Sequence, residues 1–293
     1  MKNFLNYNYN LFPDKIYDVN DEKYFFVKNY KIYIKQYEKE NIDEIVDITN
    51  KLFYNGIKIN TFLRNKEGQY ITKYKNKNII LIRVNAIESN RVEYADIFKL
   101  KNTRVKFNLK KINLLAEWTN EIDLIEKELL EYNNEYLLIK ESFDYCIGCA
   151  ENAIQLYKSS GKNNENLGLG HFNYAILNMK NYLNPLNLCI IDFNYEEANY
   201  IKSKYFMRII DYEELYNIIN RSKNPEKIFA CLLYPSYYFY LLKKLLFEQR
   251  KDFTYKEIMN YVTKIQGYKE FLSFFKKCFE KSKEIQLLDW INK

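Results

Sequence analysis

Glycine and proline are scarce in this sequence, which has 7 and 4 of them among 293 residues. No glycine precedes Gly56, so the start of the chain cannot carry the G-x-G-x-x-G loop that cradles nucleotide phosphates in many enzymes. The turn expected at residues 19–22 is instead acidic, and an acidic turn should repel a triphosphate. The missing glycines therefore argue against tight nucleotide binding through such a loop.

Paired cysteines and long apolar runs are also missing. Five cysteines are too few, and odd in number, for a disulfide framework, which predicts a reducing compartment. The first residues lack the apolar segment of a signal peptide, and the most apolar stretch, residues 228–247, is interrupted by Pro235, Lys243 and Lys244. The sequence therefore predicts a soluble, cytoplasmic protein with no membrane association.

Charge is not concentrated in any segment. The 45 Lys and Arg exceed the 38 Asp and Glu, giving a net charge of +7, but the two signs are mixed along the chain. Nucleic-acid binding requires a clustered basic stripe, so we expect no nucleic-acid partner. A moderate positive charge is compatible with an anionic ligand such as a nucleotide.

Residues 15–84 carry the pattern of strands around one helix. Polar breaks separate short runs of β-branched and aromatic residues, whereas residues 42–54 carry apolar side chains at helical spacing and end at Asn55-Gly56, a typical C-cap. A polar tight turn is expected at residues 75–78. The expected strands are 15–17, 24–27, 32–34, 69–73 and 79–84.

After residue 88 the pattern changes to amphipathic helices. Residues 92–160 and 196–293 have long apolar stripes, with one strand-like run at 186–193 between them. This order predicts an α+β, protein-kinase-like fold with two lobes. The β-rich N-lobe would comprise residues 1–88 and the larger, mostly helical C-lobe residues 89–293, with a hinge near 85–92.

The segment 167–195 within the predicted C-lobe has the pattern of a catalytic loop. His171, the only histidine, precedes Asn173 by two positions and Asn178 by seven, which is the spacing of H-R-D-x-x-x-x-N in protein kinases with asparagine in place of the aspartate. A following apolar run ends at Asp192, where kinases carry the metal-binding Asp of D-F-G. The alternative interpretation is a surface histidine beside an ordinary buried strand.

This pattern predicts ATP and Mg²⁺ as cofactors, because phosphoryl transfer requires oxygen ligands that hold Mg²⁺ on the phosphates. Asn178 and Asp192 are the candidate metal ligands, and His171 and Asn173 occupy the catalytic positions. An amide cannot accept the proton of a substrate hydroxyl, and losing a positioned base costs about 10²- to 10⁴-fold in rate. We therefore expect weak or absent turnover unless another residue replaces the base.

A lysine on the third strand should contact the nucleotide. Lys35 is the best candidate, with Lys28 and Lys31 as rivals, and its partner on the following helix would be Glu44 or Asp47. In a chain with so many lysines, a solvated strand lysine is the alternative interpretation.

Two other features are better explained by packing than by chemistry. Cys146 and Cys149 form a C-x-x-C sequence without a second pair or a nearby histidine, so we expect core packing rather than a metal or redox site. The aromatic run at residues 234–240 is expected to be core as well.

Several separated motifs resemble those of a known family. They are Phe143–Ile154, Asn184–Leu188 followed by Ile191-Asp192, Tyr200–Phe206 and Leu232–Phe239. In this order they are similar to the CotS/YutH-type spore-coat kinase-like proteins, and the similarity is firmest between residues 114 and 240. The resemblance implies an aminoglycoside/choline phosphotransferase-like fold and an association with the spore coat.

The resemblance and the catalytic loop with asparagine in place of aspartate together leave three functions open. The first is a pseudokinase that acts as a binding or scaffold protein in coat assembly, with spore coat proteins as partners. The second is an active ATP/Mg²⁺-dependent phosphotransferase on a small-molecule or protein hydroxyl. The third is a structural coat protein with a vestigial cleft.

Overall fold

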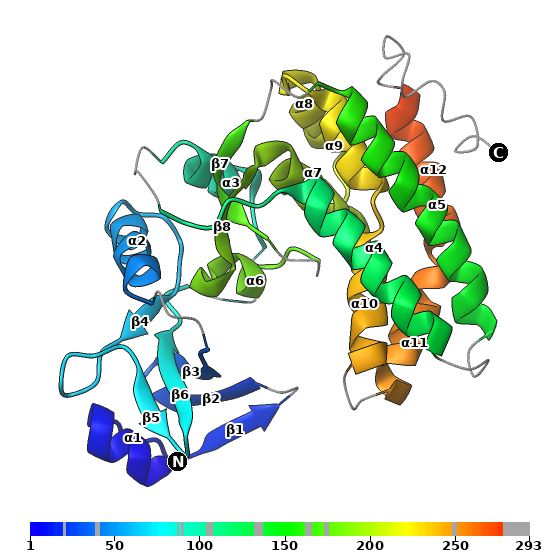
Figure 1. The fold of residues 1–293 in the computed structure, drawn as a ribbon. Helices are drawn as coiled ribbons and strands as arrows, with labels where there is room; N and C mark the ends of the chain where they lie inside the picture. Colours follow the sequence, from blue (N-terminus) through cyan, green and yellow to red (C-terminus); the bar gives the residue numbers. More distant parts are fainter. Residues whose placement is uncertain are drawn as a thin grey trace. The chain divides into compact units, whose positions relative to one another are not determined.

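The computed structural model describes residues 1–19, 22–38, 42–86, 88, 91–103, 108–131, 137–161, 166–172, 176–247 and 251–277. The chain forms two compact units (Figure 1). Unit 1 comprises Met1–Lys110 and Asn178–Cys189, and unit 2 comprises Lys111–Leu177 and Ile190–Lys293. The expected division into residues 1–88 and 89–293 stays a prediction.

Unit 1 is built on an antiparallel sheet with the strand order β1-β2-β3-β6-β4, and β5 pairs with β6. The strands are β1 (Ile16–Val19), β2 (Glu22–Val27), β3 (Tyr30–Gln36), β4 (Thr61–Leu63), β5 (Thr72–Tyr74) and β6 (Lys77–Arg83). Each expected strand overlaps an observed one, although the strand expected at 69–73 is found only at Thr72–Tyr74. Strand β4 was not predicted, because three residues are too short to give a period-2 signal.

Helices pack on both faces of this sheet (Figure 1). Helix α1 (Lys2–Tyr9) packs on the face that carries Phe25 and Leu81, and α2 (Ile42–Tyr54) packs on the face that carries Tyr33. The expected helix end is confirmed, since Gly56 has a φ of 73° and the Ile57 amide donates to the Leu52 carbonyl at 3.0 Å. Helix α1 was not predicted, because its Asn- and Tyr-rich sequence has no clear apolar stripe.

Smaller elements complete unit 1. They are α3 (Tyr94–Lys101), α6 (Met179–Leu183) and the 3₁₀ helix η1 (Pro185–Asn187). The polar turn expected between β5 and β6 is present, and its residues Lys75 and Asn76 have φ values of 48° and 62°. Two consecutive positive φ values are typical of a hairpin turn whose twist matches its strands.

Unit 2 is mostly helical. Its helices are α4 (Leu114–Glu131), α5 (Leu137–Ser159), α7 (Phe193–Phe206), α8 (Tyr212–Arg221), α9 (Pro225–Leu233), α10 (Ser236–Phe247), α11 (Lys251–Val262) and α12 (Ile265–Lys277). Strand β7 (Leu167–His171) pairs with β8 (Leu188–Asp192), whose last three residues belong to this unit. Helix α9 packs against both α5 and α7, so it lies at the centre of the unit.

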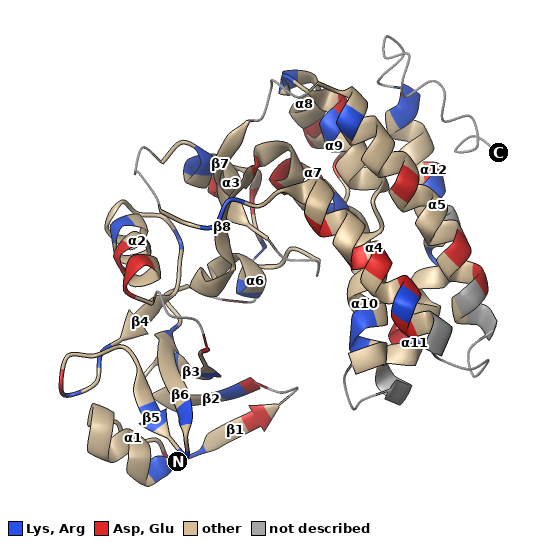
Figure 2. Cartoon of the chain, viewed as in Figure 1, with Lys and Arg blue, Asp and Glu red and all other residues tan. Residues whose placement is uncertain are grey.

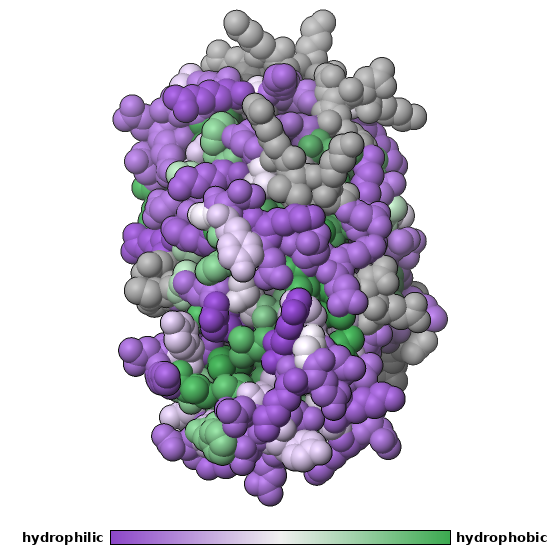
Figure 3. Space-filling model, turned by 90° about the vertical axis from the view of Figure 1, so that its left-hand side faces the viewer, coloured by the Kyte–Doolittle hydropathy of each residue, from purple (hydrophilic) through white to green (hydrophobic). Residues whose placement is uncertain are grey.

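Charged residues of both signs are spread over the described elements of both units. Lys and Arg are intermixed with Asp and Glu, in agreement with the mixed charges of the sequence (Figure 2). On the face seen in Figure 3, hydrophilic residues predominate and hydrophobic ones form a smaller area in its lower half. Among the described residues, no helix combines the length and apolar character that crossing a membrane requires.

Candidate functional site

Strand β8 ends at Asp192, the residue expected to bind metal, and this side chain caps helix α7. Its Oδ1 atom accepts hydrogen bonds from the backbone nitrogen of Asn194 at 3.1 Å and from Asn194 Nδ2 at 2.7 Å. A carboxylate in this position satisfies an otherwise unpaired helix amide and is stabilised by the positive end of the helix dipole. One oxygen of Asp192 is therefore committed to holding the start of α7.

The second oxygen of Asp192 is held by two residues from other helices of unit 2. Tyr157 on α5 donates its hydroxyl to Oδ2 at 2.7 Å, and Nζ of Lys227 on α9 lies 3.4 Å from the same atom. The side chains of Asp192 and Lys227 are only 4% and 2% exposed. A carboxylate has about four acceptor positions, and here protein donors use all four.

Asn178, the other candidate metal ligand, is also a helix cap. It belongs to unit 1, and its Oδ1 atom accepts a hydrogen bond from the Asn181 backbone at 2.9 Å at the start of α6. Among the described residues, no group of three or more His, Cys, Asp or Glu side chains could hold a metal ion. Magnesium binds through oxygen ligands, so a metal ion at Asp192 would have to displace one of the donors that hold its carboxylate in this arrangement.

His171 is buried at the end of β7 and lies against helix α7. Its backbone amide donates to Oε1 of Glu196, and its Nδ1 atom lies 3.6 Å from the same oxygen. Asn173, at the position expected for the catalytic base, lies outside the described residues. The described part of the loop therefore shows His171 in a packing contact between β7 and α7.

Gly170 makes this close approach possible. A Cβ atom at this position would lie 2.5 Å from Oε1 of Glu196 and 2.8 Å from Cγ2 of Ile191. Real Cβ atoms do not approach other atoms so closely, and inserting one into a packed interior costs typically 1–3 kcal/mol. The glycine before the histidine thus serves the packing of β7 on α7 and β8.

Lys35, the candidate nucleotide-binding lysine, lies on β3 and forms an ion pair within unit 1. Its Nζ atom is 3.2 Å from Oε1 of Glu22 on β2, and Lys180 on α6 binds the other oxygen of Glu22. Burial by itself would raise the pKa of Glu22, but the hydrogen bond from Lys180 and the positive charges of Lys35 and Lys180 together hold that pKa below its usual value. The carboxylate of Glu22 therefore forms ion pairs with both Lys35 and Lys180.

The expected helix partner does not pair with Lys35. Glu44 accepts a hydrogen bond from Nδ2 of Asn108 at 2.9 Å, and Asp47 pairs with Lys51 one turn along α2. Of the rival lysines, Lys31 pairs with Glu88 at 2.6 Å, and Lys28 lies in the β2–β3 turn with a φ of 52°.

The interior of unit 2 holds further buried polar side chains. Lys202 on α7 donates from Nζ to the Tyr234 carbonyl at 2.7 Å and to Oγ of Ser236 at 3.2 Å. Burial lowers the pKa of Lys202 to about 8. Tyr234 in turn donates its hydroxyl to Glu121 at 2.8 Å and stacks on Trp118 with ring centroids 4.3 Å apart.

Burial supports both packing predictions made from the sequence. Tyr234, Tyr238 and Phe239 of the aromatic run are at most 1% exposed, so most of this run is core. Cys146 and Cys149 are buried as free thiols in α5, and burial raises the pKa of Cys149 to about 11. Such thiols are almost entirely protonated at neutral pH and therefore unreactive.

Sequence reasoning missed the partners of the candidate residues. Nothing in the sequence marked Tyr157 and Lys227 as partners of Asp192, and Glu196 is one of several polar residues that follow Asp192. Glu22 could have been found: the sequence showed an acidic turn beside the strand that carries Lys35.

Comparison with solved structures defines the class of protein. An aminoglycoside phosphotransferase from Alicyclobacillus acidocaldarius matches with a TM-score of 0.61 at 10% identity, over 94% of this chain and 95% of that one. A spectinomycin phosphotransferase in complex with ADP and spectinomycin gives 0.57 at 11% identity, over 88% and 92%. An amicoumacin kinase in complex with AMP-PNP and Ca²⁺ gives 0.55 at 11% identity, over 90% and 91%. The chain thus has the kinase-like phosphotransferase fold, as predicted.

The family follows from the sequence. The model of the family described as spore coat putative kinase YutH matches residues 2–169, more than half of the chain, and the chain belongs to this family. The predicted resemblance is therefore confirmed. No curated protein sequence matches the chain.

Proposed function

We propose that this chain is a catalytically silent kinase-like protein that serves as a binding or scaffold protein in spore coat assembly. The contact between Lys227 and Asp192 carries the proposal. In this fold the aspartate that follows the apolar strand would hold Mg²⁺, and here a buried ammonium group supplies the positive charge that such a metal would bring. A metal ion would have to displace Lys227, Tyr157 or the cap of α7.

The contacts of Lys35 support the same proposal. Glu22 holds both Lys35, the best candidate for the nucleotide-binding lysine, and Lys180. A nucleotide would therefore have to compete with a carboxylate that is already in place. The absence of glycine before Gly56 and the asparagine at position 173 also argue against efficient phosphoryl transfer.

The cellular role rests on the family. Its description names the spore coat, so we propose spore coat proteins as partners and the cytoplasm or the spore coat as the location. Two of the structural neighbours were solved with nucleotides, one with ADP and one with AMP-PNP and Ca²⁺. Those ligands make an active ATP/Mg²⁺-dependent phosphotransferase the second candidate function, which would need a carboxylate from another position as base, because residue 173 is an amide.

A thermal-shift titration with ATP, with and without Mg²⁺, tests the proposal. A ligand at 100 times its Kd stabilises the folded state by about 2.7 kcal/mol, which raises the Tm by several degrees in a chain of this size. We expect no magnesium-dependent rise at millimolar ATP. A rise of several degrees in Tm that requires Mg²⁺ would favour the phosphotransferase. The same titration with tripolyphosphate, which lacks the nucleoside, would show whether the adenine ring of ATP contributes to binding.

A further inference from the structure

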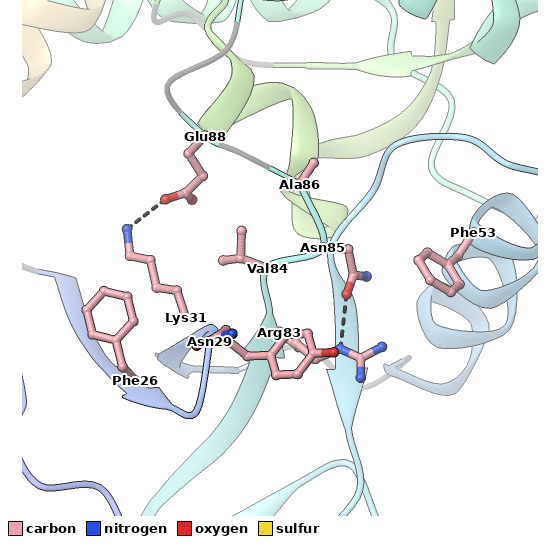
Figure 4. A pocket seen from close by; sticks show the side chains of 10 residues that line it. Phe26, Asn29, Lys31, Phe53, Arg83, Val84, Asn85, Ala86 and Glu88 are labelled. Carbon is pink, nitrogen blue, oxygen red and sulfur yellow. Dashed lines mark hydrogen bonds and ion pairs between the residues drawn. The ribbon is translucent and has the colours of Figure 1, made fainter.

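Unit 1 contains a pocket of about 520 Å³ (Figure 4), which shares only Lys31 with the candidate site residues. It is formed by the end of β2 and the β2–β3 turn, by the end of β6 with the residues that follow it, and by Phe53 of α2. This volume lies within the range of about 300–1,000 Å³ that is typical of small-molecule sites. The pocket therefore has the size of a ligand site.

The charges in this pocket leave one positive group available. Lys31 and Glu88 neutralise each other at 2.6 Å, and Glu88 also accepts the hydroxyl of Tyr33 at 2.8 Å. Arg83 donates from Nε to Oδ1 of Asn85 at 3.0 Å, and no acidic partner of Arg83 is found among the described residues. Figure 4 shows the two pairs on opposite sides of the pocket.

Arg83 is held in place by an anchored asparagine. Asn85 donates from Nδ2 to the Ile59 carbonyl and to Oγ1 of Thr61, both at 3.0 Å, and its backbone amide donates to Oδ1 of Asn60 at 3.2 Å. These bonds fix the amide oxygen that receives Nε of Arg83. The two terminal nitrogens of the guanidinium then form a preoriented fork, the geometry that binds a carboxylate through two parallel hydrogen bonds.

Three aromatic rings around the pocket are exposed. Phe26, Tyr30 and Phe53 are 48%, 50% and 38% exposed, and the guanidinium carbon of Arg83 lies 5.4 Å from the centre of the Tyr30 ring. Each exposed ring offers a flat apolar surface to a ligand. Aromatic surface next to one oriented cation is the combination that recognises a ring bearing a single negative charge.

We propose that this pocket binds a small aromatic carboxylate, with the carboxylate on the terminal nitrogens of Arg83 and the ring among Phe26, Tyr30 and Phe53. The single negative charge of a carboxylate matches the single available positive charge of Arg83. Lys31, a rival candidate for the nucleotide-binding lysine, lines the pocket, but the proposal uses only Arg83, Phe26, Tyr30 and Phe53, so it holds whether or not the chain transfers phosphate.

The test is a calorimetric titration of the full chain with 3-phenylpropionate and with its neutral amide. A fragment of this size should bind with a Kd of roughly 0.1–1 mM, and the amide should bind at least about tenfold more weakly, because a hydrogen-bonded charge contributes about 1.5–3 kcal/mol. Equal binding of acid and amide, or no binding of the acid, would overturn the proposal.

Two arginine variants locate the site. Arg83→Gln should weaken binding of the acid about tenfold or more. Arg64→Gln is the matched control, because Arg64 also lies over a ring, that of Tyr70 at 5.0 Å, but does not line the pocket. Equal losses in the two variants would contradict the assignment. If Arg83→Gln does not fold, Phe53→Ala on the exposed face of α2 should reduce the affinity severalfold, and unchanged affinity would contradict the proposal.

Discussion

Replacing Lys227 with methionine should lower the free energy of unfolding by about 3–5 kcal/mol, the usual cost of removing one partner of a buried ion pair. The variant leaves the Asp192 carboxylate buried without its cation, since both side chains are almost completely enclosed. Tyr157 and Asn194 would still donate to Asp192, but neither carries a charge. Urea denaturation of the wild type and the variant measures the difference.

A double variant separates the ion pair from packing. Asp192→Asn combined with Lys227→Met removes both charges, so most of the lost stability should return. Lys223→Met is the matched control, because Lys223 is exposed just before α9 and its loss should change stability by no more than about 0.5 kcal/mol. A Lys227→Met variant as stable as this control would show that Asp192 does not depend on Lys227.

The second large effect concerns pH and Lys202. Its pKa is lowered to about 8 in the folded state from 10.5, mainly by burial. Between these values the unfolded chain binds more protons, so stability should rise with pH. This contribution is fully present above pH 10.5 and is lost as the pH falls to 8. Its size is about 3 kcal/mol, at about 1.4 kcal/mol for each pH unit.

The comparison of wild type with Lys202→Met isolates this contribution. Buried tyrosines and cysteines also change their ionisation on unfolding above about pH 9, but they do so equally in both proteins and cancel in the difference. The stability of the wild type relative to the variant should therefore increase by about 3 kcal/mol from pH 8 to 10.5. A difference that stays constant over this range would show that Lys202 keeps its ordinary pKa in the fold.

The fold was largely predictable because its signals are local. Alternating residues in β2, β3 and β6, the stripe of α2 and the C-cap at Asn55-Gly56 each act over a few positions. The elements that escaped prediction, α1 and β4, lack a strong period of their own. Their positions are determined by packing on a sheet that has to be assembled first.

The candidate site was predictable only in part, because its chemistry depends on contacts between distant residues. The spacing from His171 to Asp192 located a strand and the start of a helix, but not the lysine and tyrosine that hold the aspartate. Tyr157 and Lys227 lie 35 positions before and after Asp192. No local pattern links residues so far apart, and a buried lysine looks like a surface lysine in a sequence so rich in them.

The partner of Lys35 was also not predicted, because it depends on contacts between strands. The position of Lys35 on β3 was predictable, but the expected partners were Glu44 and Asp47 on the following helix, and the observed partner, Glu22, depends on how the strands pair. The register places Lys23 opposite Ile34, which brings the start of β2 next to Lys35. The acidic turn noted in the sequence thus contains Glu22, which forms the ion pair with Lys35.

Release of phosphate from ATP in the presence of Mg²⁺, compared between the wild type and Asp192→Asn, tests the central claim most directly. If Asp192 has a structural role, both proteins should release phosphate only at the background rate of the buffer. The Asp192→Asn variant should, however, unfold at a lower urea concentration than the wild type. Magnesium-dependent release by the wild type that disappears in Asp192→Asn would contradict the account, and Asp192 would then be a metal ligand of an active phosphotransferase.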